Sequence, residues 1–261
     1  MHISKKDLER MNQQIGLYNP ELHKDSCGVG FVADFTGKKS RKIIDYGLEI
    51  IKRIEHRGAV GADPETGDGA GIQIQIPDKF FRKVLDPIGI QLPAYGRYAV
   101  GFFYMPRKKT LREKVQNIIE KVVEDEGQRF LGWREVPINE QYCGELAKKT
   151  LPFFMQGFIE ADASIKNSYD FERKLFLIRR VIDRRIRAEL KLDRSQYYVP
   201  SFSSKTINYK GMLKAEQLIH FYPDITDPDM ESAYTMIHMR FSTNTFPTWD
   251  LAQPFRMIAH N

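Results

Sequence analysis

Two cysteines are the strongest potential nucleophiles in this chain of 261 residues, and their surroundings differ. Cys27 stands in the run DSCGVG, just before a short apolar segment, whereas Cys143 has no distinctive neighbours. A thiol attacks as its thiolate, so a catalytic Cys27 would need a base. If residues 1–26 were a removable propeptide, the freed α-amine of Cys27, with a reference pKa of about 7.7–8.0, could be that base. The alternative is a small buried cysteine beside flexible glycines.

A second group of polar residues surrounds Arg57, and a glycine-rich run follows it. Residues 58–71 include five glycines and lie between an expected helix and an expected strand. A phosphate-binding loop is disfavoured, because no Gly-Lys-Ser or Gly-Lys-Thr follows and the glycines precede a strand rather than a helix. The run therefore predicts a tight loop that lines a substrate site, or an ordinary turn. Arg57 taken alone is more typical of a surface or ion-pair residue.

A third group, HMRFSTNT at 238–245, ends an expected strand with alternating polar and apolar residues. Arg240 could hold a carboxylate through two parallel hydrogen bonds, although an arginine at a strand end commonly has a structural role. His238 lacks a partner at the H-E-x-x-H spacing of zinc sites, so a hydrogen-bonding or core role is favoured. Because the chain stops abruptly at Asn261, we expect a piece of a longer protein; the alternative is a frayed end without a function.

Hydrophobic periodicity predicts the elements that must position these groups. Thr110 and Glu113 form a capping-box pattern at the start of one helix, and Gly127 suits its C-terminal end. The strands come in neighbouring groups, which favours an α+β layered fold with antiparallel pairing over a doubly wound parallel sheet. We expect helices over 41–55, 110–126, 171–194 and 214–221, and strands over 28–35, 72–76, 98–105, 130–138, 153–160, 196–203, 205–209 and 234–242.

The net charge and its distribution along the chain bear on the kind of partner that the protein could bind. The chain carries 40 Lys and Arg against 34 Asp and Glu, a net charge of +6, and residues 171–194 alone hold nine of the basic and four of the acidic residues. This segment has an apolar stripe at helical spacing, so we expect an amphipathic helix with a solvated basic face; contact with an acidic partner surface is the alternative. Nucleic acid is disfavoured as a partner, since no recognised binding motif accompanies the helix.

Composition adds further limits. Two cysteines do not support a disulfide scaffold or a zinc site built from three or four thiolates. No uncharged run approaches the roughly 18 residues that suggest a membrane helix, and residues 1–10 lack the apolar core of a targeting signal. We therefore expect a cytoplasmic chain without a membrane partner.

Taken together, these stretches resemble the N-terminal domain of the glutamate synthase large subunit, a class II glutamine amidotransferase with an N-terminal nucleophile. The similarity runs through nearly the whole chain in family order. The matching stretches are KDSCGVGFVA (24–33), EHRGAVGADPETGDGAGIQIQIP (55–77), GWREVP (132–137), YVPSFSSKTINYKGMLKAEQLIHFYPD (198–224) and HMRFSTNTFPTWDLAQPFRMIAHN (238–261).

The resemblance implies a four-layer αββα sandwich of antiparallel sheets, here C-terminally incomplete. It implies a propeptide-like segment at 1–26 and a partial amidotransferase domain at 27–261. The activity would be that of a glutaminase, which converts L-glutamine to glutamate and ammonia through a thioester on Cys27.

The resemblance also implies roles for other residues. Asn261 would belong to the oxyanion hole, where one donor is typically worth about 10²–10³ in rate. Arg240 would bind the α-carboxylate of glutamine, and Thr243 would contact the substrate nearby. Arg57 would support the surroundings of the nucleophile.

In the family, ammonia passes to a synthase domain or subunit that uses FMN and an iron–sulfur cluster. We expect neither cofactor in this chain, because two cysteines cannot ligate such a cluster and no flavin motif is present. The family continues after the asparagine with Gly-Glu-Ile-Asn, which supplies a second oxyanion donor, and later with an aspartate for the substrate amino group. Because both lie beyond Asn261, we expect the chain as given to be weak or inactive. A non-catalytic regulatory or assembly module is the alternative.

Overall fold

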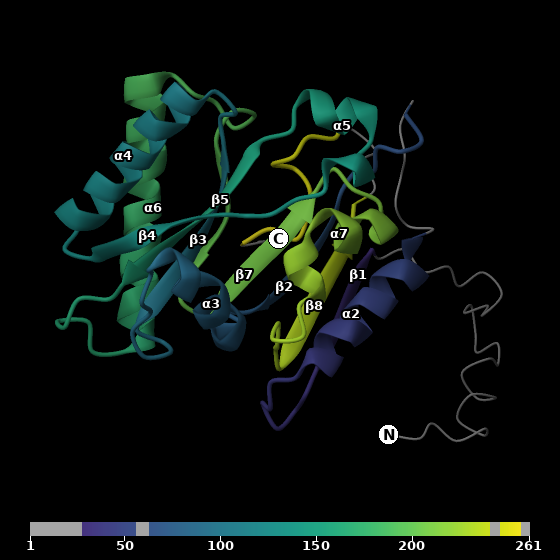
Figure 1. The fold of residues 1–261 in the computed structure, drawn as a ribbon, viewed down its shortest axis with the longest axis horizontal. Coiled ribbons are helices and arrows are strands. Elements are labelled where there is room, and N and C mark those ends of the chain that lie inside the picture. The colour runs from purple at the N-terminus through teal and green to yellow at the C-terminus, as the bar shows by residue number, and fades with distance from the viewer. Residues whose placement is uncertain (1–27, 56–62, 241–245, 257–261) are drawn as a thin grey trace, which may run out of the picture.

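The computed structural model describes residues 28–55, 63–240 and 246–256, which form two antiparallel sheets covered by helices (Figure 1). The first sheet has the strand order β1–β8–β2–β7, and each neighbouring pair is antiparallel. Its strands are β1 (Val29–Ala33), β2 (Ala70–Gln75), β7 (Thr206–Gly211) and β8 (Tyr234–Met239). The second sheet has the order β4–β5–β3–β6 and is also antiparallel. Its strands are β3 (Tyr98–Met105), β4 (Arg129–Glu135), β5 (Phe153–Glu160) and β6 (Tyr198–Ser203).

Helices cover both sheets. The first sheet contacts α2 (Arg41–Arg53) and α7 (Ala215–Phe221), and the second contacts α4 (Lys109–Asp125) and α6 (Ser168–Leu190). Two shorter helices are α3 (Asp78–Leu85) and α5 (Glu145–Lys149). Figure 1 shows the layers in order, from α4 and α6 through the two sheets to α2 and α7. The predicted α+β fold with an αββα sandwich is confirmed. Among the described residues, no helix is long and apolar enough to cross a membrane.

Strand β3 lies at the centre of the packing because both of its faces are buried. Phe102 and Tyr104 point into the larger core, which collects residues of both sheets and of α2, α3 and α7. Phe103 and Met105 point into a smaller core against α4 and α6. Burial on both faces explains the uninterrupted apolar run YAVGFFYM. The predicted basic helix is α6, and its apolar stripe lines the smaller core.

Of the two predictions made for the ends of α4, the C-terminal glycine is confirmed and the N-terminal capping box is wrong. Gly127 has φ +75° and closes the helix as predicted, because its N–H bonds to the Glu124 carbonyl and the next N–H bonds to Val123. The predicted capping box at Thr110 is wrong. The helix begins one residue earlier, at Lys109, and the residue before it makes no side-chain capping bond.

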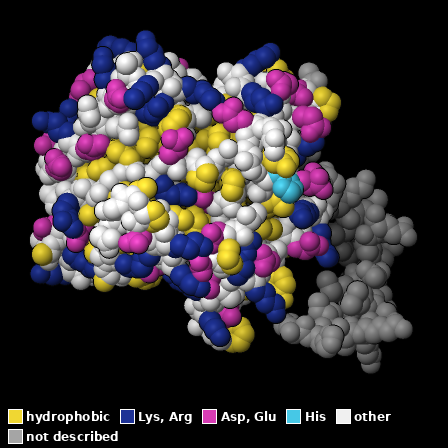
Figure 2. All heavy atoms as spheres, in the orientation of Figure 1, with side chains coloured by type: hydrophobic (Ala, Val, Ile, Leu, Met, Phe, Trp, Pro, Cys, Tyr) yellow, Lys and Arg dark blue, Asp and Glu magenta, His cyan; other side chains and the backbone are white. Residues whose placement is uncertain are grey.

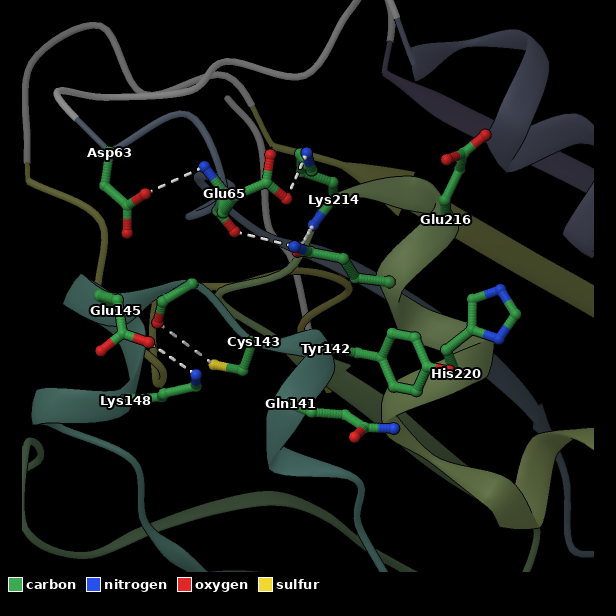
Figure 3. Close-up of a pocket in the computed structure, with 12 residues that line it drawn as sticks. Asp63, Glu65, Gln141, Tyr142, Cys143, Glu145, Lys148, Lys214, Glu216 and His220 are labelled. Carbon is green, nitrogen blue, oxygen red and sulfur yellow. Dashed lines mark hydrogen bonds and ion pairs between the residues drawn. The ribbon is translucent and has the colours of Figure 1, made fainter.

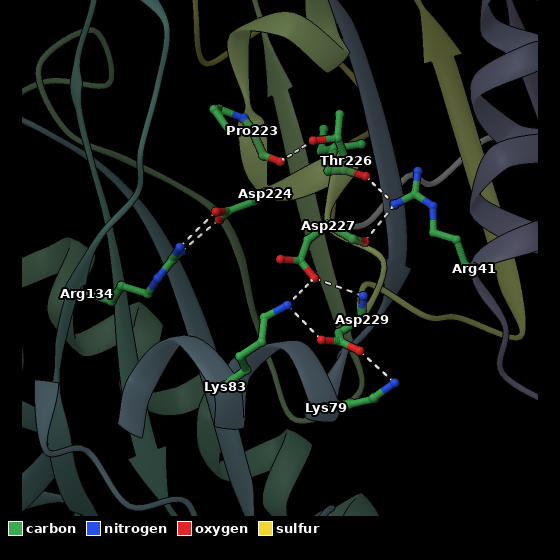
Figure 4. Close-up of polar contacts among 10 residues, drawn as sticks. Arg41, Lys79, Lys83, Arg134, Pro223, Asp224, Thr226, Asp227 and Asp229 are labelled. Atoms are coloured by element: carbon green, nitrogen blue, oxygen red, sulfur yellow. Dashed lines mark hydrogen bonds and ion pairs between the residues drawn. The ribbon is translucent and has the colours of Figure 1, made fainter. Parts of the chain in front are cut away.

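A buried ion pair fastens the turn after α7 to the second sheet. Arg134 on β4 donates two hydrogen bonds to the Asp224 carboxylate, both at 2.8 Å, and the two side chains are only 9% and 3% exposed. Arg41 on α2 donates to the Asp227 carbonyl, and Lys83 on α3 pairs with the Asp227 carboxylate at 2.7 Å. Figure 4 shows these side chains converging on the same turn. Three helices and a strand are therefore held together around it.

The molecular surface carries both signs of charge. On the face seen in Figure 2, Lys and Arg side chains are interspersed with Asp and Glu side chains. Such a mixture is typical of an ordinary solvated surface.

Candidate active site

Arg240 follows directly after β8, at the point where three segments meet. Strand β8 lies between β1 and β2, and His238 is opposite Val29 on one side and Gly71 on the other. Because both pairings are antiparallel, the end of β8 lies beside the beginnings of β1 and β2. Gly28, the glycine-rich run before β2 and Arg240 therefore lie together at one end of the first sheet.

Backbone hydrogen bonds fix Arg240 at this end of the sheet. Its N–H donates to the Gly69 carbonyl at 2.8 Å, and the preceding N–H, of Met239, donates to the Gly28 carbonyl at 2.7 Å. The Arg240 side chain is buried, and its Nη1 donates to the Asp68 carbonyl at 3.3 Å. The guanidinium is thus oriented by the glycine-rich run that precedes β2.

Two glycines permit this close approach. A Cβ on Gly28 would lie 2.2 Å from the Met239 carbonyl oxygen, so no larger residue fits there. Gly69 has φ +146°, and a Cβ on it would lie 3.0 Å from Ala252. Only glycine readily adopts this backbone conformation. Residues 66–69 therefore form a tight loop beside Arg240, directly before β2.

Lys210 is a functional candidate that the sequence reasoning missed. It lies on β7 and is fully buried, and its Nζ donates to the carbonyls of Asp250 (3.1 Å) and Ala252. The ammonium also lies 4.8 Å from the centre of the Tyr198 ring. Burial, followed by the positive charge of Arg256, lowers the pKa of Lys210 to about 7. Nothing in the sequence around Lys210, which lies within a strand and next to a glycine, indicates that its side chain is buried.

His238 is held neutral beside Arg240. Burial lowers the pKa of His238 to about 4, so the imidazole carries no charge near pH 7. No cluster of three or more His, Cys, Asp or Glu side chains that could hold a metal ion occurs in the part of the chain that the structure describes. His238 is half-buried and belongs to neither core cluster, so its predicted core or hydrogen-bonding role stays a prediction.

Four of the predicted site residues lie outside the described residues: Cys27, Arg57, Thr243 and Asn261. Arg240 is the predicted site residue that the structure places. Gly28, which follows Cys27 in the sequence, is described and lies beside the end of β8.

A cavity of about 440 Å³ lies elsewhere, and many of the residues that line it are charged or polar (Figure 3). Its polar groups bond largely to one another. The Asp63 carboxylate accepts hydrogen bonds from the N–H groups of Glu65 and Leu146, both at 3.0 Å, and from the Thr66 hydroxyl at 2.7 Å. Lys214 pairs with Glu65 at 3.0 Å. These contacts anchor the segment that leads into the glycine-rich loop.

Cys143 lines the same cavity but is not poised for nucleophilic chemistry. Its side chain is buried, and burial raises the pKa of the thiol to about 12. A protonated thiol is a poor nucleophile. The side chain therefore suits a structural role.

Comparison with known proteins assigns the chain to a family. The family model of the class II glutamine amidotransferases matches residues 27–261. The chain is 44% identical to the glutamate synthase [NADPH] large chain of Bacillus subtilis over 252 residues, which are 97% of this chain and 16% of that protein. The corresponding protein of Azospirillum brasilense is 44% identical over 245 residues, with 94% of this chain and 16% of that protein covered. The glutamate synthase [NADH] of Saccharomyces cerevisiae is 36% identical over 271 residues, covering 100% and 12%. The chain thus spans 16% or less of the length of these relatives. It belongs to the class II glutamine amidotransferases.

Proposed function

We propose that this chain is the glutaminase domain of a glutamate synthase, and that it hydrolyses L-glutamine to glutamate and ammonia. The observation that carries the proposal is that the starts of β1 and β2 and the end of β8 meet at one end of the first sheet. Gly28, which follows Cys27, and Gly69 both accept hydrogen bonds from the backbone around Arg240. A nucleophile before Gly28 and a carboxylate-binding arginine would then act on one substrate. The family match and the names of the relatives support the same function.

In the proposed reaction, the thiolate of Cys27 attacks the γ-carboxamide carbon of glutamine, and the carbonyl oxygen becomes an oxyanion. The side-chain amide of Asn261 would donate a hydrogen bond to that oxyanion. The α-amine of Cys27 would protonate the departing ammonia, and would then activate the water that cleaves the thioester and releases glutamate. This use of the α-amine requires removal of residues 1–26, which is supported by the family match that begins at Cys27.

The substrate carboxylate would bind to Arg240. Arg240 and Arg256 both interact electrostatically with Lys210, so two guanidinium charges lie on this side of the sheet. Hydrogen bonds to a charged group typically contribute about 1.5–3 kcal/mol. Thr243 would contact the substrate, and Arg57 would support the surroundings of the nucleophile.

For the parent protein, we infer that ammonia passes to a synthase domain or subunit. That part would hold the FMN and the iron–sulfur cluster, and the whole would work in the cytoplasm. The support is that the relatives are glutamate synthases several times longer than this chain.

A glutamine-mimicking diazoketone tests the glutaminase proposal on the purified chain with residues 1–26 removed. We expect one adduct, located on Cys27 by peptide mass spectrometry, and none in Cys27→Ala. Arg240→Met should raise the half-saturating reagent concentration by about 10- to 150-fold, which corresponds to about 1.5–3 kcal/mol. The control Arg184→Ala changes an exposed residue of α6 and should label normally. An adduct on Cys143, or unchanged half-saturation in Arg240→Met, would contradict the proposal.

A further inference from the structure

A second cavity, of about 140 Å³, opens between α6, β6 and Arg256. This volume is several times the roughly 30 Å³ that one water molecule occupies in the liquid. The Arg179 side chain is 12% exposed, Tyr197 is 6% exposed and Arg256 is half-buried, whereas Arg180, Arg187 and Arg194 are exposed at the rim of the cavity. Its charged and aromatic lining includes Arg179, Arg180, Arg187, Arg194, Arg256 and Tyr197.

Two polar groups of this wall lack partners. The Tyr197 hydroxyl and Nη1 of Arg256 are buried, and neither has a hydrogen-bond partner among the described residues. The hydroxyl interacts electrostatically with Arg179, Arg256 and Asp183, and all four residues line the cavity. Buried polar groups in proteins are nearly always hydrogen-bonded. Two such groups at one cavity therefore indicate a ligand that supplies the missing acceptors.

The two aspartates of the cavity offset only part of the positive charge of its arginines. Asp183 pairs with Arg179 at 2.7 Å. Asp193 accepts hydrogen bonds from the backbone N–H and the hydroxyl of Ser195 instead. For the other four arginines, the described part of the chain shows no ion pair with a carboxylate. Five arginines against two aspartates leave a formal charge of 5 − 2 = +3 around the cavity.

We propose that this cavity binds a phosphate group, either as free phosphate or at the end of a small organic molecule. A guanidinium presents two parallel N–H donors that match two oxygens of a tetrahedral oxyanion, and the remaining oxygens can accept from the Tyr197 hydroxyl. A dianion also offsets most of the +3 charge. Arg256 stands five residues before Asn261 in the sequence, so the site is close along the chain to the proposed oxyanion donor. The role of that donor rests on the proposed function, whereas the binding site does not.

Calorimetric titration of the purified chain with inorganic phosphate tests the site, with the ionic strength held constant by chloride. We expect saturable binding of one phosphate per chain. Tyr197→Phe removes only the hydroxyl, so the fold is retained and phosphate binding should weaken by about tenfold or more. Arg256→Gln should weaken it further. Arg184→Ala is the matched control, because Arg184 lies on α6 but does not line this cavity, and its binding should be unchanged.

Adenosine monophosphate distinguishes the two sources of the phosphate group. Tighter binding than that of inorganic phosphate assigns the site to an organic phosphate, and weaker binding assigns it to the free anion; both support the proposal. No saturable heat with either compound overturns it, as does equal weakening in Arg184→Ala and Tyr197→Phe. A response to heparin alone also overturns it, since it assigns the arginines to a polyanionic partner. None of these readouts uses labelling of Cys27, so failure here is distinguishable from failure of the proposed function.

Discussion

Lys210 should make the folded chain more stable as the pH rises above neutrality. Its side chain is fully buried, and Nζ donates to the carbonyls of Asp250 and Ala252. Burial, and then the charge of Arg256, lowers its pKa from 10.5 to about 7. The neutral amine keeps two N–H bonds, which are enough to serve both carbonyls. The folded state therefore favours the uncharged lysine.

The direction of the effect follows from the two pKa values. The pKa of Lys210 is lower in the folded chain than in the unfolded chain. Between about pH 7 and pH 10.5 the unfolded chain therefore binds more protons, and the unfolding free energy rises with pH. Below about pH 7 both states are protonated, and the full penalty for burying the charge is present. At 1.36 kcal/mol for each tenfold change in proton affinity, that penalty is about 5 kcal/mol. From roughly pH 6.5 to pH 9, the expected gain in unfolding free energy is about 2.5 kcal/mol.

Lys210→Met isolates this contribution, because methionine has a similar shape and does not titrate. Urea unfolding of both proteins at several pH values gives the difference between their unfolding free energies. From roughly pH 6.5 to pH 9, we expect the unfolding free energy of the unsubstituted chain to rise by about 2.5 kcal/mol relative to that of Lys210→Met. The loss of two hydrogen bonds to carbonyls adds an offset that does not depend on pH. If the difference in unfolding free energy stays constant with pH within about 0.5 kcal/mol, the reasoning is refuted. The two carbonyls would then stabilise the protonated lysine enough to keep its pKa near the unfolded value.

Three further predictions follow from other contacts. Asp224→Asn leaves the buried guanidinium of Arg134 without its carboxylate and should lower the unfolding free energy by about 3–5 kcal/mol in urea titrations; a loss below about 1 kcal/mol would show a weak pair. Cys143 should react with a thiol reagent only after denaturation, so rapid reaction of native Cys27→Ala chain would argue against its burial. Gly69→Ala should cost about 1–3 kcal/mol and slow diazoketone labelling, whereas Gly89→Ala, also at positive φ but with open space around it, should leave labelling unchanged.

The long elements follow from the sequence because their apolar patterns span several turns or a whole strand. The alternation IQIQI marks β2, and the stripe of α6 extends through its full length. Helices α3 and α5 were missed, since eight and five residues are too few for a periodic pattern to stand out. At the start of α4, the Arg112 guanidinium donates to the carbonyls of Pro106 and Arg107. We infer that these contacts begin the helix before the capping pattern at Thr110.

The residues of the candidate active site and of the proposed phosphate site differ in how far the sequence alone marks them as functional. Arg240 stands in a distinctive run of polar residues, and the family resemblance gives it a role. No sequence pattern marks Lys210 or Tyr197 as functional. A lysine in a strand is usually expected to face solvent, and a tyrosine is usually expected to pack in the core. Both become informative only through what covers them, which is the segment 246–256 for Lys210 and the arginine-rich wall for Tyr197.

The sequence by itself determined the family, the candidate nucleophile and the alternation of apolar residues that builds two antiparallel sheets. The tertiary structure decided that Gly28, Gly69 and Arg240 meet, because β8 inserts between β1 and β2. It also decided that Lys210 is buried. Strand order and burial arise from contacts between residues far apart in the chain, and local patterns of residues do not encode such contacts.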